Sequence, residues 1–299
     1  MKTDEKRRVV ACVDNRVGYE ALRILLSNEG TELCAVIVHP EKTISWGTEI
    51  RALCEKHDVP VFDVEEARLE FDELVGHLEP DFLLSIYYDY ILDDRFLSLP
   101  KIDAINLHPG YLPYNKGFYY YVWSVLDGTP AGVSLHRMVA EVDKGDVIAQ
   151  ARVLVTPEDT GETLYRKHED EAIRLFRSTW PAIVHEEYKL YPQAHPGTHH
   201  KLREMRALLN LDPHATTTAR ELIDTLRVCT FPGRAGCTIA LDGRTYQINL
   251  SLREVRDTAA SLPGKRPAKS SDAAERSTST NLTVSPSAAV SRNMAGANS

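Results

Sequence analysis

The sequence predicts an α/β fold in which a mostly parallel sheet carries helices on both faces. In the first half, short runs of Val, Ile and Leu alternate with segments whose apolar residues recur at helical spacing. The apolar runs show no polar alternation, which is typical of strands buried on both faces. Strands separated by helices form βαβ units and a parallel sheet. The pattern therefore indicates a Rossmann-like architecture, followed by a small C-terminal α+β unit.

The strands of the predicted sheet follow one another through the first half of the chain. The run "RRVVACV" is β-branched, and four further short runs of the same kind come after it. Two longer runs then follow and have the composition of a paired β-hairpin. We expect strands at 7–13, 33–38, 59–62, 81–86, 103–107, 131–138 and 146–155.

The helices between these strands are predicted from the 3.6-residue period. Leu22 and Leu25 share one face of the first helix, and Gly30 ends it. Thr160 is the expected N-cap of a long helix, in which Pro181 is expected to cause a kink or an end. We expect helices at 18–30, 47–58, 65–78 and 160–184, with a short helical turn in 83–94.

The composition changes after residue 190. The turn-rich segment "YPQAHPGTHH" marks a boundary, 218–229 has the helical period, and 237–252 reads as two strands around Asp242-Gly243, a type I′ hairpin signal. Beyond about Val255 the chain is rich in Ser, Ala, Thr, Lys and Pro, too polar to order itself. We expect domains at 1–190 (catalytic) and 191–255 (a helix and β-hairpin unit), with a disordered tail at 256–299.

Charge and composition exclude several classes of protein. The net charge of −8 disfavours non-specific nucleic-acid binding, and the 14 Lys and Arg against 9 acidic residues after residue 200 are a thin excess for an RNA track. The five cysteines lack metal-ligand spacing, so we expect reduced core thiols and no metal. No apolar run approaches the ~20 residues that span a bilayer. The charged N-terminus has no signal-peptide core, so we expect a cytoplasmic protein.

The stretch "INLHPGYLPYNKG" holds the candidate chemistry. Asn106 and His108 flank Leu107 at a strand end, so alternation places both side chains on one face. An amide N–H beside a protonated imidazole suits an oxyanion that develops on one carbon. Pro109 and Gly110 begin a stiff, turn-rich loop of the kind that a site built on positioning needs.

Asp143 lies in "EVDKGDVIAQ", between the two longest strands. A carboxylate there is able to reach back to His108 and raise its pKa, or to hold a water. Its position before Gly145 also fits an ordinary turn residue. The first strand is followed by "DNRVG" rather than G-x-G-x-x-G, so nothing indicates a dinucleotide cofactor.

These pieces in order resemble one enzyme family. Asn106, the segment from His108 to Gly117, the strand "GTPAGVSLHRM" and Asp143-x-Gly145 are similar to the 10-formyltetrahydrofolate-dependent formyltransferases, over roughly residues 8–190. Members act on glycinamide ribonucleotide, methionyl-tRNA or nucleotide-linked amino sugars. The resemblance implies that Asn106, His108 and Asp143 are the catalytic set, with 10-formyltetrahydrofolate as co-substrate.

The resemblance also implies two binding regions. The donor's pterin ring is expected against "LLSIYYDYILDD" and the loop "VAEVD", largely through backbone groups; the candidates are Ser85, Ile86, Tyr87, Tyr88, Ile91, Leu92, Val139, Glu141 and Val142. The acceptor is expected along the loop after His108; the candidates are Pro109, Gly110, Tyr114, Asn115, Lys116, Gly117, Tyr119 and Tyr120. The tyrosines of "GFYYYVWSVLDG" have a second interpretation, as the buried face of a helix with Tyr119 and Trp123 four residues apart.

The acceptor amine is the open question. "VSLHRM", "PYN" followed by a basic residue and glycine, and the short C-terminal unit are more like the enzymes that act on nucleotide-linked amino sugars. An RNA-binding barrel needs five strands, and only two or three are expected here. In the sugar enzymes such a unit serves dimer contacts, so we expect a homodimer. Methionyl-tRNA formyltransferase, 10-formyltetrahydrofolate hydrolase and a non-catalytic nucleotide- or folate-binding module remain alternatives.

Overall fold

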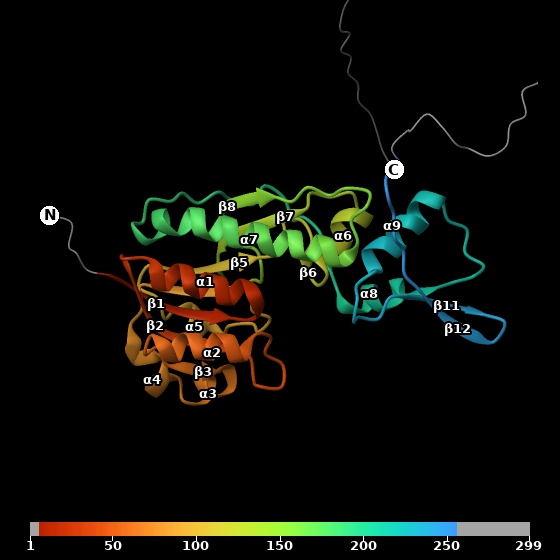
Figure 1. Cartoon of the computed structure of the whole chain (residues 1–299). Helices are drawn as coiled ribbons and strands as arrows, with labels where there is room; N and C mark the ends of the chain where they lie inside the picture. Colours follow the sequence, from red (N-terminus) through yellow and green to blue (C-terminus); the bar gives the residue numbers. More distant parts are fainter. Residues whose placement is uncertain (1–5, 256–299) are drawn as a thin grey trace, which may run out of the picture. The chain divides into compact units, whose positions relative to one another are not determined.

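A seven-stranded sheet in the order β3-β2-β1-β4-β5-β7-β8 organises the protein (Figure 1). The computed structural model describes residues 6–255, and residues up to Glu254 form one compact unit. The predicted disordered tail at 256–299 lies outside the described residues. The strands are β1 (Arg7–Val13), β2 (Thr31–Val38), β3 (Val61–Asp63), β4 (Phe82–Ile86), β5 (Asp103–His108), β6 (Lys116–Gly117), β7 (Gly132–Arg137), β8 (Val147–Arg152), β9 (His199–His200), β10 (Asn210–Leu211), β11 (Cys237–Leu241) and β12 (Arg244–Ile248).

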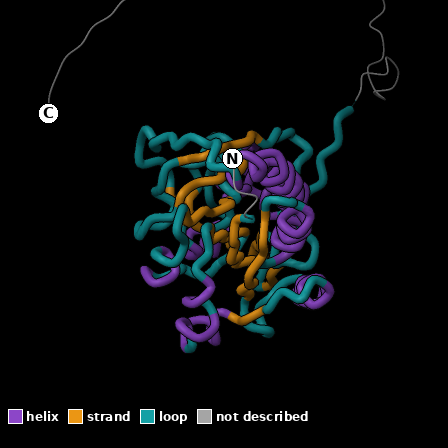
Figure 2. The backbone as a smooth tube through the Cα atoms, turned by 90° about the vertical axis from the view of Figure 1, so that its left-hand side faces the viewer, coloured by secondary structure: helices purple, strands orange, loops and turns teal. Residues whose placement is uncertain are grey.

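Helices cover both faces of this sheet, as Figure 2 shows. The first five strands of the order pair in parallel, and β7 and β8 add antiparallel pairs. This confirms the predicted fold class. The helices are α1 (Asn15–Ser27), α2 (Gly47–Lys56), α3 (Val64–Leu69), α4 (Phe71–Leu74), α5 (Asp94–Leu97), α6 (Tyr120–Leu126), α7 (Gly161–Val184), α8 (Leu202–Leu208) and α9 (Ala219–Cys229), with a 3-10 turn η1 at Gly76–Leu78.

Two apolar cores lie against the two faces of the sheet. The larger core packs α1, α2 and α7 on one face, and the smaller core packs α3, α4 and α5 on the other. On β5, Ile105 and Leu107 point into the larger core and Ala104 into the smaller one. Because side chains alternate along a strand, Asn106 and His108 lie on the same face as Ala104.

The described C-terminal part adds a three-stranded sheet, β10-β11-β12, and the helices α8 and α9. Asp242 and Gly243 both have positive φ (49° and 73°), which confirms the predicted type I′ turn between β11 and β12. A third apolar core joins this part to α6 and the start of α7; it includes Tyr121, Leu164, Leu226, Val228 and Cys237. The two parts therefore share buried surface.

Local chemistry explains where the elements differ from the predicted ones. Helix α1 begins at Asn15, because the Asn15 side chain accepts the amide N–H of Val17 (2.8 Å). The predicted helix 65–78 is three short pieces, the first of which carries a capping box between Asp63 and Glu66. The helix α7 covers almost the whole predicted range 160–184, and it continues past Pro181 to Val184.

Candidate active site

Asn106 and His108 lie together at the carboxyl end of β5, as alternation predicted. The His108 side chain is buried, and its Nε2 has no hydrogen-bond partner among the described residues. The Nδ2 atom of Asn106 lies 3.2 Å from Nε2 of His136. An amide and an imidazole nitrogen that is free to exchange a proton therefore stand side by side.

Asp143 reaches this pair from the loop between β7 and β8. Its Oδ1 lies 3.5 Å from Nδ1 of His108 and 3.6 Å from Nε2 of His136. Gln193 holds the loop by donating to the carbonyl oxygens of Asp143 (2.9 Å) and Gly145 (2.8 Å). The structure thus brings the three predicted catalytic side chains into one cluster; their roles stay a proposal.

His136 is a site residue that the sequence reasoning missed. It faces Asn106 across the β5–β7 pair and is almost fully buried. Its Nδ1 lies 2.8 Å from the carbonyl oxygen of Arg137, and because a carbonyl only accepts, the Nδ1 carries the proton. In the neutral ring Nε2 then accepts from Asn106 and turns the amide N–H₂ toward the cluster. The signal was the second polar residue of "VSLHRM", but the register between the strands was unknown.

Burial and charge act in opposite directions on the protonation of this cluster. Burial works to raise the pKa of Asp143, but His108, His136 and Lys116 outweigh it and lower the pKa to about 2. Burial lowers the pKa of His108 below its ordinary value, and the Asp143 carboxylate offsets only part of that effect. This direction does not support the expectation that Asp143 keeps His108 protonated in the ligand-free protein.

The loop after His108 is held against β7 and β8. Ser134 donates to the carbonyl oxygen of Gly110 (2.7 Å) and accepts the amide N–H of Leu112 (3.0 Å), while Gln150 donates to the carbonyl oxygen of Leu112 (2.8 Å). A Cβ on Gly110 would lie 2.7 Å from Nε2 of His108. Glycine therefore leaves the reactive face of the imidazole open.

The predicted acceptor contacts divide into buried and accessible side chains. Asn115 is buried and accepts from the hydroxyls of Thr129 (3.0 Å) and Thr198 (3.3 Å), so its side chain supports the loop. Lys116 is also buried and donates to the carbonyl oxygen of Pro196 (3.2 Å), and burial lowers its pKa. The hydroxyl oxygen of Tyr114 lies 3.0 Å from Nε2 of His195, within hydrogen-bond distance.

The aromatic run after Gly117 forms the N-terminal part of α6. Tyr120 is buried against the ring of His168 (4.9 Å between centroids), and Tyr121 and Trp123 are buried as well. The helix interpretation of the run is therefore the one the structure supports. Tyr119 precedes the helix in a left-handed conformation (φ 60°). A direct contact between Tyr120 and the acceptor does not fit this burial.

The predicted donor region presents apolar side chains from two loops. Ile91, Val139 and Val142 are 69%, 41% and 56% exposed, and Pro109 begins the adjoining loop. Leu92 and Met138 anchor the two loops in the smaller core, on the face that carries Asn106 and His108. Exposed apolar side chains on two loops that are anchored on this face of the sheet suit a flat ring.

The other candidates of the donor region lie deeper. Ser85 and Ile86 are buried at the end of β4, and Tyr88 packs on His39 (4.7 Å between centroids). The side chain of Tyr87 turns into the larger core, which does not fit a side-chain contact with the donor. Glu141 is exposed and pairs with Lys144 (2.5 Å). Donor contacts through the backbone groups of this segment stay a prediction.

Within residues 6–255, no group of three or more His, Cys, Asp or Glu side chains is arranged to hold a metal ion. The same range contains no helix that is long and apolar enough to cross a membrane.

Two family models match the chain. The model of formyl transferases covers residues 28–179, just over half of the chain. The model of the N-formyltransferase dimerization C-terminal domain covers residues 204–254, the described part that carries α9 and the β11–β12 hairpin. The two matches cover the sheet domain and the C-terminal part separately.

A curated relative is the bifunctional polymyxin resistance protein ArnA of Wigglesworthia glossinidia brevipalpis. It is 29% identical over 182 residues, which cover 59% of this chain and 28% of the relative. The chain therefore spans little more than a quarter of the length of this relative.

Solved structures share the fold. A 4-N formyltransferase from Francisella tularensis has a TM-score of 0.72 at 22% identity, covering 83% of this chain and 99% of its own. An N-formyltransferase from Helicobacter canadensis, solved with folinic acid and dTDP-3-aminofucose, has a TM-score of 0.64 at 20% identity, covering 80% and 85%. A methionyl-tRNA formyltransferase from Clostridium thermocellum also matches, at a TM-score of 0.56 and 12% identity over 83% and 94%.

Proposed function

Because the chain belongs to the formyl transferase family, we propose that it transfers a formyl group from 10-formyltetrahydrofolate to the amine of a nucleotide-linked amino sugar. The observation that carries the proposal is the cluster of Asn106, His108 and Asp143, with the buried Nε2 of His108 open for a proton. The Helicobacter structure, with a folate and a nucleotide-linked amino sugar bound to the same fold, supports the choice of both substrates.

The proposed reaction uses the neutral state of His108. The uncharged amine attacks the formyl carbon, a C–N bond forms, and the carbonyl electron pair moves onto oxygen. Asn106 donates a hydrogen bond to that oxyanion. Nε2 of His108 takes the proton from the attacking nitrogen, and the Asp143 carboxylate stabilises the imidazolium that results. Collapse breaks the bond to the folate nitrogen, which receives the proton from His108.

The binding regions follow from the exposed side chains. The donor ring lies on the apolar surface of Ile91, Val139 and Val142, with backbone groups of 85–92 around it. The acceptor amine approaches along the loop after His108. Asn115, Lys116 and Gly117 act by holding that loop through β6 and β9.

We also propose two domains, 1–190 and 191–255, and a homodimer that forms through the C-terminal part. The match of 204–254 to a dimerization domain supports the homodimer. All five cysteines lie in the described range as free thiols. Free thiols support the proposal that the protein acts in the reducing cytoplasm.

The test is an acceptor panel. The protein is incubated with 10-formyltetrahydrofolate and a set of nucleotide-linked amino sugars, and tetrahydrofolate release is followed by absorbance. We expect one or more sugars to raise the rate far above the rate with water alone. Release at the water rate with every sugar, together with formylation of methionyl-tRNA, would overturn the choice of acceptor.

A further inference from the structure

A buried histidine–aspartate pair lies beside the predicted donor segment and takes no part in the proposed formyl-transfer steps. His39 directly follows β2 and is 3% exposed, and Asp14 directly follows β1 and is 7% exposed. Nδ1 of the imidazole lies 3.6 Å from a carboxylate oxygen of Asp14. Burying two ionisable groups lowers stability unless their hydrogen bonds are made, so the contacts of the pair indicate what it holds.

The imidazole of His39 holds the backbone of the donor segment 87–92. The amide N–H of Asp89 donates to Nε2 of His39, at 3.2 Å. The rings of Tyr88 and Tyr90 pack on the imidazole, with centroids 4.7 and 5.0 Å away. Both tyrosines also pack against the smaller core, on the face of the sheet opposite to α7. One side chain therefore contacts three consecutive residues of the segment.

The tautomer of His39 follows from these contacts. A ring nitrogen that accepts from an amide N–H carries no proton, so the neutral ring carries its proton on Nδ1. That N–H faces the Asp14 carboxylate. The second carboxylate oxygen of Asp14 accepts the amide N–H of Ser45 (2.7 Å), which fixes the direction of the carboxylate. Asp14 therefore keeps Nε2 of His39 in the state that accepts from Asp89.

The donor segment has a backbone that needs such support. It begins at Tyr87, whose φ of 50° lies in the left-handed region that residues other than glycine seldom adopt. Arg68 holds the other end by donating to the carbonyl oxygen of Ile91 (2.6 Å). His39 and Arg68 thus fix an amide and a carbonyl group on either side of Tyr90. Strained backbone of this kind persists only where the surrounding contacts enforce it.

The shape of this segment decides where a bound donor lies relative to the catalytic cluster. Ile86, the last residue of β4, pairs with Leu107 of β5, which stands between Asn106 and His108. The segment therefore starts beside the catalytic residues, and it carries Ile91, part of the surface proposed for the donor ring. A displacement of about 1 Å is enough to slow a reaction that depends on positioning.

We propose that His39 is a positioning residue for the formyl donor and that Asp14 sets its tautomer. The pair holds the segment 87–92 in the conformation that receives the pterin ring before the donor arrives. The inference rests on the proposed function, because that function supplies the donor. It adds to the donor site two buried side chains that act through the backbone of the segment.

Two substitutions separate the two nitrogens of His39. His39→Gln retains an acceptor near the position of Nε2, whereas His39→Asn is one methylene shorter and retains a polar group only near the position of Nδ1. Each protein is titrated with folinic acid by calorimetry, without any amino sugar. We expect His39→Asn to bind at least about tenfold more weakly and His39→Gln to stay within about threefold of the wild type, because a segment that is not held is only partly in its binding conformation.

Steady-state kinetics distinguish positioning from a general loss of stability. His39→Asn is expected to raise KM for 10-formyltetrahydrofolate about tenfold or more and to leave KM for the amino sugar near its wild-type value. Val75→Ala truncates a fully buried side chain of the same smaller core, outside the segment, and is the control. It is expected to lower the melting temperature and to change neither KM.

Asp14→Asn gives an independent measurement should His39→Asn not fold. The asparagine presents one oxygen to two N–H groups, so it no longer fixes the proton on Nδ1 of His39. We expect Asp14→Asn to weaken binding of folinic acid by about threefold or more in the otherwise wild-type chain, and to have no such effect in the His39→Gln background. Equal effects in the two backgrounds would mean that Asp14 does not act through His39.

The outcomes separate this inference from the proposed function. Wild-type affinity of His39→Asn for folinic acid overturns the inference and leaves the acceptor panel to decide the function. Equal rises in both KM values, or equal weakening by His39→Asn and His39→Gln, also overturn it. Absence of folinic acid binding by the wild type overturns the inference and the proposed donor together. Weak binding by His39→Asn with near-normal binding by His39→Gln supports the inference whichever sugar the panel identifies.

Discussion

The hydrogen bonds around Asn106 decide what its amide is able to do. His136 fixes the Nδ2 atom toward the cluster by accepting one of its hydrogens, which leaves the second N–H for an oxyanion. Sequence reasoning found Asn106, His108 and Asp143 but not His136. Strand alternation places residues on a face, whereas the partner across a sheet depends on a register that the sequence does not state.

Asn106→Ala is expected to lower kcat about 10²- to 10³-fold, the usual cost of one oxyanion donor. KM for the amino sugar is expected to change little, because the amide contacts the oxyanion rather than the ground state. Steady-state kinetics check this, with thermal melting as the control for folding. A variant that retains near-normal kcat would remove Asn106 from the mechanism.

The pH profile tests the neutral state of His108. Its pKa is lowered by burial, so activity persists above the ordinary histidine value and falls only as the pH drops through the lowered one. The Asp143 carboxylate acts to raise the pKa of His108. Asp143→Asn removes that charge, so the pKa of His108 is expected to fall further. The decline of kcat/KM at acid pH is then expected to move to lower pH, and kcat itself is expected to fall. A decline that moves to higher pH would contradict the assigned interaction.

At the scale of elements, strands and long helices were predictable and their ends were not. The five parallel strands came from apolar runs, and α7 from its period and its N-cap Thr160. The short strands β6 and β9 were missed, because each has two residues and forms only through the other. The continuation of α7 past Pro181 shows tertiary packing overriding a local preference, with Trp180, Ile183 and Val184 buried in the larger core.

Gly145→Ala tests the loop that carries Asp143. A Cβ at this position would clash with the carbonyl oxygen of Arg137, so the loop has to shift. We expect a loss of about 1–3 kcal/mol in the free energy of unfolding and a kcat close to that of Asp143→Ala. Gly76→Ala, whose nearest contact is a side-chain oxygen at 3.3 Å, is the control. Full activity in Gly145→Ala would show that the loop position does not matter.

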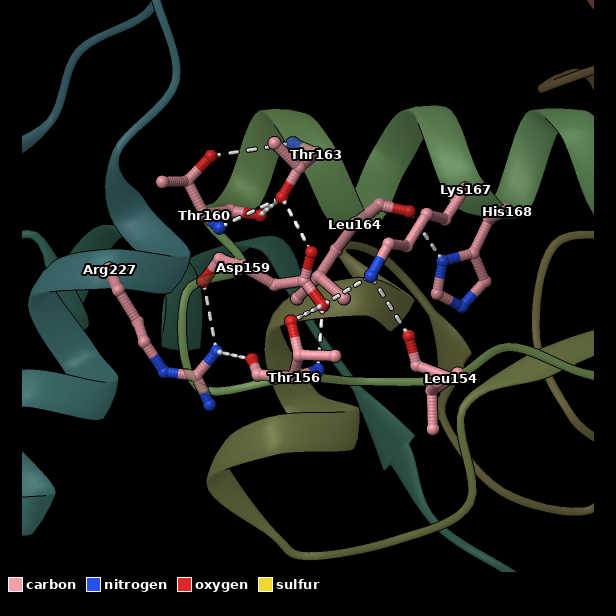
Figure 3. A network of polar contacts seen from close by, with 9 residues as sticks. All are labelled: Leu154, Thr156, Asp159, Thr160, Thr163, Leu164, Lys167, His168 and Arg227. Atoms are coloured by element: carbon pink, nitrogen blue, oxygen red, sulfur yellow. Dashed lines mark hydrogen bonds and ion pairs between the residues drawn. The ribbon is translucent and has the colours of Figure 1, made fainter. Parts of the chain in front are cut away.

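At the scale of the whole described chain, a polar network joins the C-terminal part to the sheet domain (Figure 3). Arg227 on α9 is 4% exposed and donates to the carbonyl oxygens of Thr156 (3.2 Å) and Asp159 (2.9 Å). The carboxylate of Asp159 accepts from Lys167 (2.7 Å) and Thr163 (2.9 Å). Composition located the boundary near residue 190, but this coupling depends on side chains far apart in sequence.

Arg227→Met is expected to lower the free energy of unfolding by about 2–4 kcal/mol, since buried carbonyl groups lose a charged donor. Arg220→Met removes an arginine that is 79% exposed and pairs with the same Asp224, and is expected to cost less than about 1 kcal/mol. Urea unfolding of both variants makes the comparison. Equal losses would mean that the network does not stabilise the contact between the two parts.

The most direct test of the central claim follows the formyl carbon itself. The protein, 10-formyltetrahydrofolate labelled with carbon-13 in the formyl group, and an amino sugar nucleotide that is active in the panel are observed together by NMR. The account predicts a formamide signal on the sugar in step with tetrahydrofolate, slowed at least about 100-fold in Asn106→Ala. A label that leaves the donor only as formate, with no formamide signal on the sugar, would contradict it.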